Sequence, residues 1–404
     1  MKEKIKDFTL MFLFISLIFD PTGDFFNFKY ISVLACFFVF GINFLINYRV
    51  IHFTKTQLLF LSTFCLFIPI YGLNLTLFNT DLSNFSDTSY IGFALTTFLL
   101  IPTLFHTSNS FIKVFINSLR ILMACIFFIL ISFLIDGDSL GLAQFFIDHK
   151  SMLMGFREYS GITTYYIYFT ASPLLIILVA YDSYSFLNKS SFIKFILLTL
   201  SIIAIFLTGT RFNMLVSILI LPLAMILKKY SIKRVFFNFL ILLTFLVIVK
   251  NNKFTSSFFK SSDDSNNTKI GYLQSYIPIF SNPKFFILGQ GFNAHYWSTD
   301  FKLLMTKSDN DGTKTELTYL EFLRVFGVFF GIILNLFVFS MPIVLYLVYK
   351  EFNFLVLGVL IYILSSAINP YIFSTNGVLV FLLFLISINK SSKFGTLKLI
   401  ERND

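Results

Sequence analysis

The chain has 404 residues, of which 56% are hydrophobic and 13% are charged, and its formal net charge is +10. This small share of polar residues cannot cover the surface of a water-soluble globule of this size. The composition therefore excludes a soluble enzyme and predicts a protein solvated by lipid. The excess of Lys and Arg is spread over many short loops and forms no continuous basic patch, which argues against nucleic acid as a partner.

A transmembrane helix needs about 20 apolar residues, or fewer where Lys or Arg at its ends reaches the interface. Twelve runs meet this requirement, so we predict an all-α polytopic membrane protein with about 12 transmembrane helices in a single domain over residues 1–404. The first run lacks a signal-peptidase site and is expected to stay uncleaved. The predicted spans are 7–20, 30–48, 57–78, 90–105, 119–135, 161–181, 192–208, 211–227, 234–249, 317–349, 352–368 and 373–389.

The distribution of basic residues predicts the orientation of these spans. With the N-terminus inside, most Lys and Arg residues of the short loops fall on one face, which the positive-inside rule assigns to the cytoplasm. The short loops on the other face hold only Lys29, Lys150, Arg157 and Arg211. Both termini are therefore expected in the cytoplasm.

Two loops on the outer face are more than connectors. Residues 136–160 mix apolar and polar residues and are expected to form a short interfacial helix before Arg157. Residues 250–316 form a large outer loop that begins polar, becomes amphipathic at 270–287 and turns at Asn282-Pro283. We expect this loop to carry part of a functional site.

Arg211 and Arg157 are the candidate arginines on the outer face. Arg211 follows the tight turn Thr208-Gly209-Thr210, which gives it little freedom to move. A charge at depth costs about 3 kcal/mol and tends to face a polar cavity, although an arginine at a helix end also serves as an anchor to lipid phosphates. Two arginines on one face could bind a pyrophosphate through forked hydrogen bonds, whereas Arg157 alone fits a loop residue paired with Glu158 or Asp148.

Glu316 precedes the tenth span in the run TELTYLEFLRVFG. Helical spacing would place Glu316, Tyr319 and Leu320 on one face near the first turn, where the positive end of the helix dipole stabilises a carboxylate. Glu316 is thus a candidate base, although the position also suits a carboxylate of purely structural value. Glu321 and Arg324 follow at i,i+3 spacing and are expected to pair with each other.

The run Gly289-Gln290-Gly291-Phe292-Asn293-Ala294 fits the pattern G-x-G-x-x-A. A dinucleotide site would need a strand before it and a helix after it in a cytoplasmic βαβ unit, and this copy lies in an outer loop, so we reject that interpretation. His295 is the histidine nearest to the candidate site. The four histidines and three cysteines show no metal-ligand spacing and no P-loop is present, so neither a cofactor nor a metal is expected.

Together these motifs resemble the membrane-embedded O-antigen polymerase (Wzy type) and O-antigen ligase superfamily. The similarity covers the chain from about residue 155 and rests on four runs: SNPKFFILGQGF at 281–292, TELTYLEFLRVFGVFFG at 315–331, TGTR at 208–211 and REYSGI at 157–162. The ligase branch has a histidine eleven residues before the position of Gly327, where this chain has Glu316. The resemblance therefore favours the polymerase.

The resemblance implies a GT-C-like, metal-independent membrane glycosyltransferase that acts on the periplasmic face of the bacterial inner membrane. It would polymerise undecaprenyl-pyrophosphate-linked oligosaccharide repeat units into O-antigen or capsule-type polysaccharide, with membrane lipid, a chain-length regulator and a flippase as partners. In this scheme Glu316, Arg211 and Arg157 are catalytic, and the residues expected to bind substrate are Gly289, Gly291, His295, Tyr319 and Arg324.

Two other functions fit the same sequence. A ligase would move the same donor onto lipid A-core oligosaccharide, and a flippase would translocate lipid-linked units without chemistry. Transporters usually show repeated halves or helices broken near the midplane. The sequence shows neither feature, and its candidate polar residues gather at one surface, so it favours the polymerase.

Overall fold

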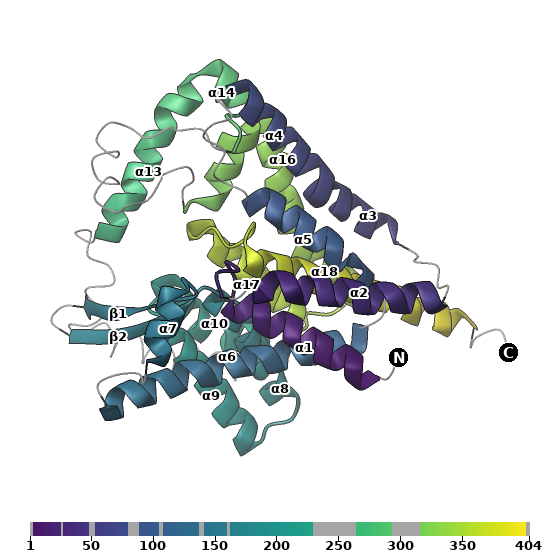
Figure 1. Cartoon of the computed structure of the whole chain (residues 1–404), viewed down its shortest axis with the longest axis vertical. Coiled ribbons are helices and arrows are strands. Elements are labelled where there is room, and N and C mark those ends of the chain that lie inside the picture. The colour runs from purple at the N-terminus through teal and green to yellow at the C-terminus, as the bar shows by residue number, and fades with distance from the viewer. Residues whose placement is uncertain are drawn as a thin grey trace.

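The computed structural model is mostly helical, with a two-stranded antiparallel sheet (Figure 1). The helices are α1 (Glu3–Phe19), α2 (Phe28–Asn47), α3 (Lys55–Leu61), α4 (Ile68–Asn79), α5 (Ser89–Leu104), α6 (Ser108–Asp136), α7 (Leu142–Asp148), α8 (Leu175–Asn188), α9 (Phe192–Leu207), α10 (Arg211–Leu227), α13 (Asp264–Ser281), α14 (Pro283–Leu288), α16 (Thr318–Tyr349), α17 (Phe354–Ser365) and α18 (Thr375–Ile400). The strands are β1 (Met152–Tyr159) and β2 (Ile162–Phe169).

The structure describes residues 3–25, 27–47, 53–79, 89–104, 108–136, 141–159, 162–228, 264–292 and 316–400. The predicted span 234–249 lies outside these residues.

Three segments are long and apolar enough to cross a membrane: Lys55–Asn79, Ser110–Ile135 and Thr318–Tyr349. The first joins α3 to α4 through the π-helical turn Ser62–Phe67, and several other described helices are apolar but shorter. Apolar side chains also face outward, as Leu336 on α16 does with 63% of its surface exposed. These helices indicate a multi-pass membrane protein, although the described residues do not show the twelve predicted spans.

The β1–β2 hairpin corrects the prediction of an all-α fold and of a helical span at 161–181. The two strands pair in antiparallel register over their full length. The β2 run ITTYYIYF is rich in β-branched and aromatic side chains, which favour a strand, and its hydropathy alone does not distinguish a strand from a membrane helix. Within the predicted outer loop 136–160, α7 supplies the expected short helix, and β1 follows it.

Helix α16 is broken at Gly327, which corrects the prediction of one continuous tenth span. Gly327 has φ 73° and ψ 173°, which no helix tolerates. The Asn335 amide donates to the carbonyl of Tyr319 at 3.2 Å, and a Cβ on Gly331 would lie 2.7 Å from the carbonyl oxygen of Phe322. Sixteen residues of straight helix would span about 24 Å, so the part of α16 before the break must fold back along the part after it.

We call residues 318–326 the folded-back arm of α16 and residues 328–349 its long arm. Figure 1 shows the two arms diverging from the end of α16 that lies near α14. The ring of Tyr319 packs against that of Phe339 with centroids 4.8 Å apart. The fold-back therefore carries Glu316 away from the tip of α16 toward the middle of the long arm.

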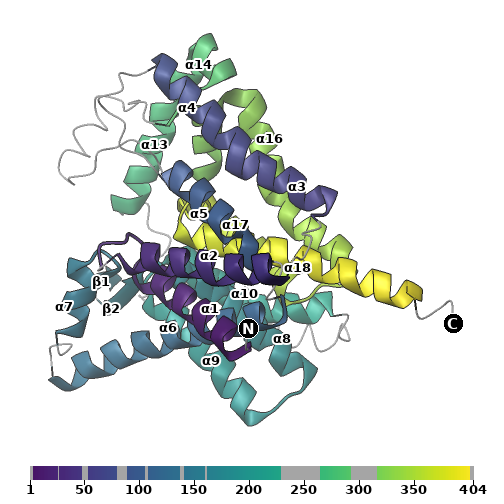
Figure 2. The same cartoon turned by 45° about the vertical axis from the view of Figure 1, so that its right-hand side comes forward.

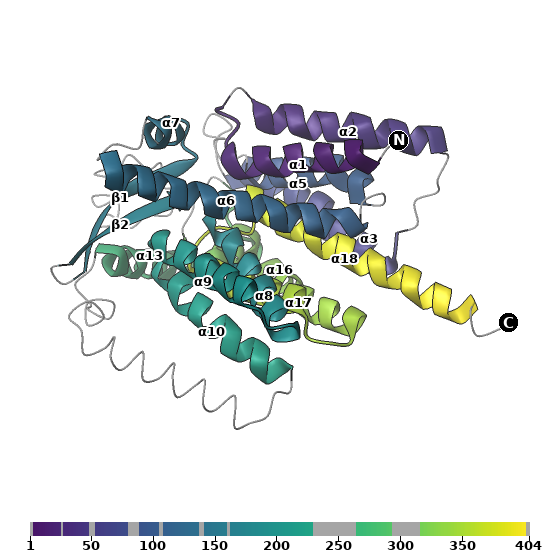
Figure 3. The same ribbon diagram turned by 90° about the horizontal axis from the view of Figure 1, so that it is seen from below.

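Helix α18 lies at the centre of the fold. It contacts α1, α5, α6 and α16, and its side chains Leu379, Leu382 and Leu385 are fully buried. Figure 3 shows α18 running between the N-terminal helices and the group formed by α8, α16 and α17, and Figure 2 shows α2 lying across α18. Apolar packing around α18 thus fixes the loop that precedes it.

Segments that are far apart in the sequence meet at one end of α18. The Lys29 ammonium, just before the predicted second span, donates to the Thr375 hydroxyl at 3.2 Å. The Asn376 amide donates to the carbonyl of Thr170, directly after the hairpin, at 2.6 Å. The start of α2, the hairpin and the start of α18 are therefore held together.

Candidate functional site

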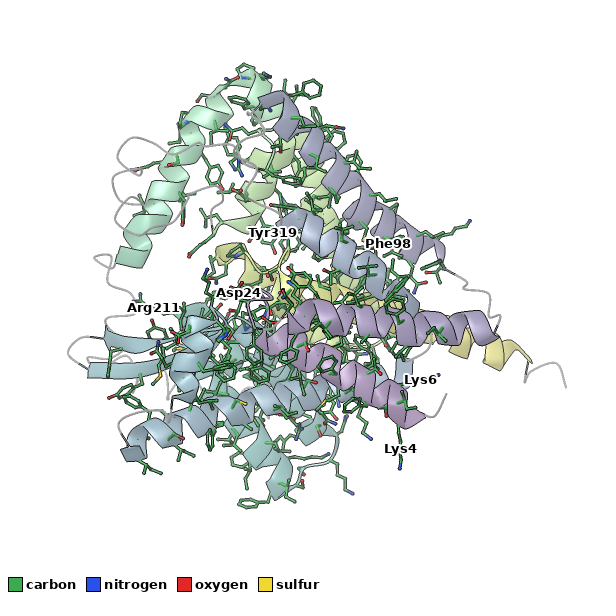
Figure 4. All side chains as sticks on the ribbon, viewed as in Figure 1. Lys4, Lys6, Asp24, Phe98, Arg211 and Tyr319 are labelled. Atoms are coloured by element: carbon green, nitrogen blue, oxygen red, sulfur yellow. The ribbon has the colours of Figure 1, made fainter. Side chains whose placement is uncertain are left out.

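The three predicted catalytic residues lie on three different elements. Arg211 is half-buried and begins α10 after a turn in which Gly209 has φ 71°. Arg157 lies in β1, where its backbone is opposite Thr164. Glu316 is exposed and comes two residues before α16. The hairpin contacts α9, which leads into the turn before Arg211, and Figure 4 shows Arg211 close to the hairpin.

The predicted position of Glu316 in the first turn of a helix is wrong. Helix α16 begins at Thr318 with Leu317 as its N-cap residue, so Glu316 lies outside that turn. The Thr318 hydroxyl donates to the carbonyl of Asn369 at 2.9 Å. This bond holds the chain at Glu316 next to the connection between α17 and α18.

Two buried tyrosines lie within electrostatic reach of the Glu316 carboxylate. Burial raises the pKa of Tyr272 on α13 to about 12, and the carboxylates of Glu316 and Glu321 add to this. Burial also raises the pKa of Tyr371, with Tyr168 and, more weakly, Glu316 adding to it. Both phenols therefore keep their protons at neutral pH and act as hydrogen-bond donors.

Tyr371 connects the surroundings of Glu316 to the hairpin. The hydroxyls of Tyr168 on β2 and Tyr371 are hydrogen-bonded at 3.3 Å, and the Tyr362 hydroxyl of α17 donates to the Tyr371 carbonyl at 2.9 Å. Because β2 pairs with β1, the same hairpin carries Arg157. Hydrogen bonds thus join Tyr371 to the hairpin and to α17.

Arg324 is fully buried, and the pairing with Glu321 that the sequence predicts is confirmed. Its Nε donates to Glu321 Oε2 at 3.1 Å, and its Nη2 donates to Glu321 Oε1. The Tyr276 hydroxyl of α13 donates to the same Oε2 at 2.9 Å. The guanidinium also donates to the carbonyls of Gly291 and Phe292, at 3.3 and 3.4 Å. These bonds compensate for burying the charge.

The Gly289-Gln290-Gly291 turn docks on the break in α16. The amides of Gln290 and Gly291 donate to the carbonyls of Arg324 and Val325, at 2.8 and 3.1 Å. Both glycines have positive φ, and a Cβ on Gly289 would lie 2.4 Å from the Val325 carbonyl oxygen. The turn therefore satisfies carbonyls that the break leaves without helical partners. We call this turn, with Tyr276, Glu321 and Arg324, the polar clasp.

Most of the residues predicted to bind substrate have structural partners. Arg324, Gly289 and Gly291 are buried in the polar clasp. Tyr319 is half-buried, and its hydroxyl donates to the carbonyl of Ile363 on α17. These four residues hold α16 in place, and a role in substrate binding stays a prediction.

The remaining predicted site residues differ in whether the structure describes them and in how exposed their side chains are. His295 lies outside the described residues. Glu316 is exposed and Arg211 is half-buried, so a substrate can reach both side chains. In the part of the chain that the structure describes, no group of three or more His, Cys, Asp or Glu side chains could hold a metal ion.

The tyrosines near Glu316 are not among the site residues predicted from the sequence. Tyr272 and Tyr276 lie one helical turn apart on α13 and are both buried. Their i,i+4 spacing was a readable signal of a face packed against another element. Tyr168 and Tyr371 gave no such signal. The hydrogen bond between their hydroxyls depends on the hairpin, and the sequence predicts a helix there.

Comparison with known proteins adds no family to this description. The chain matches no protein-family model, no curated protein and no solved structure.

Proposed function

We propose that this chain is a metal-independent membrane glycosyltransferase that polymerises undecaprenyl-pyrophosphate-linked oligosaccharide repeat units on the periplasmic face of the bacterial inner membrane. The observation that carries the proposal is the exposed Glu316 carboxylate, which the bond from Thr318 to Asn369 holds near Tyr371. Tyr371 is in turn hydrogen-bonded to Tyr168 of the hairpin that contains Arg157. Arg211 lies close to the same hairpin (Figure 4). A carboxylate and two guanidiniums are the groups that such a transfer requires.

In the proposed reaction, the growing polysaccharide on undecaprenyl pyrophosphate is the donor and a single lipid-linked repeat unit is the acceptor. Glu316 takes the proton of an acceptor hydroxyl as its oxygen attacks the anomeric carbon of the donor. The bond from that carbon to the pyrophosphate oxygen breaks. Arg157 and Arg211 stabilise the charge that develops on the departing pyrophosphate, because forked guanidinium donors match its oxygens.

The ligase is the alternative within the same class, since it uses the same donor with a lipid A-core acceptor. Glu316 stands where the ligase branch has a histidine, which favours the polymerase. The polysaccharide profile of a deletion strain separates the two functions. Loss of a polymerase leaves single repeat units on the core, whereas loss of a ligase leaves the core bare.

The break in α16 favours a second candidate of another class, a flippase for lipid-linked oligosaccharides. Helices broken near a substrate site are typical of transporters, and their absence from the sequence pattern had counted against this function. In transporters, however, the free backbone groups at such a break face the substrate or the coupling ion. In α16 the Gly289-Gln290-Gly291 turn occupies them, so the glycosyltransferase is the better-supported function.

Purified protein in lipid nanodiscs, supplied with a synthetic lipid-linked repeat unit, tests the proposal. We expect products longer than one unit and release of undecaprenyl pyrophosphate, without any need for lipid A-core. Glu316→Gln should abolish polymerisation, because an amide cannot accept the hydroxyl proton. Polymerisation at the wild-type rate by this variant would exclude Glu316 as the base, and translocation of an unaltered unit across vesicles would favour the flippase.

A further inference from the structure

The part of helix α13 from Ile270 onward is uncharged, as expected for a segment in contact with lipid, although the sequence predicts an outer loop there. Residues 270–283 carry no Asp, Glu, Lys, Arg or His, and Lys269 and Lys284 flank them. Uncharged segments of this length are too short to span a bilayer and are typical of re-entrant or interfacial helices. Lysines at both ends suit such a position, because their ammonium groups reach the headgroups.

The buried face of α13 packs on the folded-back arm of α16. Tyr276 and Ile279 form a small apolar cluster with Phe280, Leu317 and Leu320, separate from the main core. Tyr276 also donates to the Glu321 carboxylate in the polar clasp. This face is therefore fully occupied, and it fixes which side of α13 points outward.

The opposite face of α13 is apolar and uncovered. Ile270, Leu273 and Ile277, at i, i+3 and i+7, have 51%, 49% and 65% of their surface exposed. A helix in water normally presents charged residues on its outer face. The exposed side chains between Ile270 and Ser281 include Gln274 but no charged residue.

Helix α14 continues this apolar surface to the long apolar helices. Phe286, Ile287 and Leu288 have 41%, 47% and 46% of their surface exposed. The Tyr71 hydroxyl of α4 donates to the Leu288 carbonyl at 3.0 Å, and α14 packs against α16, whose Phe329 is 66% exposed. The exposed apolar faces of α4, α14 and α16 are thus adjacent.

We propose that α13 and α14 lie in the outer leaflet of the bilayer as a re-entrant element, with lipid acyl chains covering the face formed by Ile270, Leu273, Ile277 and Phe286–Leu288. Continuity with the exposed faces of α4 and α16 identifies hydrocarbon as the occupant, and the exposed Lys284 ammonium lies where it can meet a lipid phosphate. The proposal is independent of the glycosyltransferase proposal.

Depth-dependent fluorescence quenching tests this placement in nanodiscs. Single cysteines replace Leu273 or Ile277 in a variant whose Cys36, Cys65 and Cys125 are changed to Ser, and each is labelled with an environment-sensitive fluorophore. Lipids brominated on their acyl chains should quench the fluorophores at both positions, as they quench a fluorophore at Leu336→Cys on the long arm of α16. Asp24→Cys, in the exposed loop before α2, should keep its intensity.

The outcomes distinguish lipid from other occupants. Stronger quenching by bromines near the headgroup than by bromines at the bilayer centre is expected for an apolar face about 5–10 Å deep. If the labels at residues 273 and 277 are as little quenched as the label at Asp24→Cys, and if a membrane-impermeant maleimide labels both positions fully, the face is exposed to water and the proposal is overturned. Protection that appears only as the protein concentration rises would overturn it in favour of a second copy of the chain. The labelled positions replace exposed side chains, so these substitutions should leave the fold of the cysteine-free variant unchanged.

Discussion

A fully buried guanidinium such as that of Arg324 is stable only where its N–H groups find acceptors. Glu321 supplies two carboxylate oxygens, and the turn that contains Gly291 supplies carbonyls. Glu316 represents the opposite case, because its carboxylate is exposed. Glu321 in the first turn of α16 thus has a structural role, whereas Glu316 before the helix can meet a substrate.

Replacing Arg211 by Lys tests whether its guanidinium acts on a pyrophosphate. A point ammonium cannot make forked hydrogen bonds, so the polymerisation rate should fall about 10- to 100-fold, which is about the value of one charge-assisted hydrogen bond. Initial rates of chain extension in nanodiscs measure the effect. Lys189→Ala, an exposed basic residue between α8 and α9, is the control and should leave the rate unchanged. An unaltered rate for Arg211→Lys would remove Arg211 from the mechanism.

Replacing Arg324 by Ala tests the polar clasp. The change leaves the Glu321 carboxylate buried without its partner and should lower the free energy of unfolding by about 3–5 kcal/mol. Thermal unfolding in detergent measures this loss, with Lys350→Ala, exposed after α16, as the control. The double variant Glu321→Leu, Arg324→Met should unfold at a higher temperature than Arg324→Ala, because it buries no unpaired charge. Equal unfolding temperatures for Arg324→Ala and the wild type would contradict a structural role.

At the scale of elements, glycines allow three segments to meet at one point. Added Cβ atoms would lie 2.1 Å from the Phe292 ring at Gly72 on α4, and 2.1 Å from the carbonyl oxygen of Ile287 at Gly327 on α16. A Cβ on Gly291 would lie 2.6 Å from the backbone of Thr76. Side chains at these positions would push α4, the turn and α16 apart. The fold-back of α16 therefore depends on the three glycines.

The variant Gly327→Ala should therefore lose the fold-back. Its Cβ would clash with backbone, and φ 73° is unfavourable for alanine, so we expect a destabilisation of about 1–3 kcal/mol or more. Spin labels at residues 320 and 336 report the geometry, because a straight helix would separate them by about 24 Å and the fold-back brings them much closer. Gly92→Ala is the matched control, since nothing lies within 4 Å of an added Cβ there. If the distance between the two spin labels stays short in Gly327→Ala, the fold-back does not require the glycine.

The elements differ in how far the sequence could predict them. The helices predicted at 192–208 and 211–227 match the bounds of α9 and α10, because a short polar turn separates two strongly apolar runs. The fold-back of α16 has the same hydropathy as a continuous span, and only contact with the turn at 289–291 distinguishes the two. The Glu321–Arg324 pair could be predicted from its spacing. The sequence could not predict which of the two glutamates is buried, because the burial of Glu321 follows from the fold-back.

At the scale of the whole molecule, two groups of contacts lie at different points along α18. One group contains Lys29 and Thr375, which are hydrogen-bonded to each other. Gln57, at the start of α3, donates to the carbonyl of Leu385, far along α18 from Thr375, at 3.0 Å. The distribution of basic residues assigns the first group to the outer face, and the proposed reaction requires Glu316 to be accessible from that side.

Cysteine labelling in spheroplasts tests this orientation. In a variant without Cys36, Cys65 and Cys125, a membrane-impermeant maleimide should label Asp24→Cys in intact spheroplasts and Lys189→Cys only after permeabilisation. Glu316→Cys should behave like Asp24→Cys, because its side chain is exposed and its chain is held near the connection between α17 and α18. Labelling of Glu316→Cys only after permeabilisation would place the carboxylate on the cytoplasmic side, where it could not act on repeat units that have already been translocated, and the polymerase would have to be abandoned.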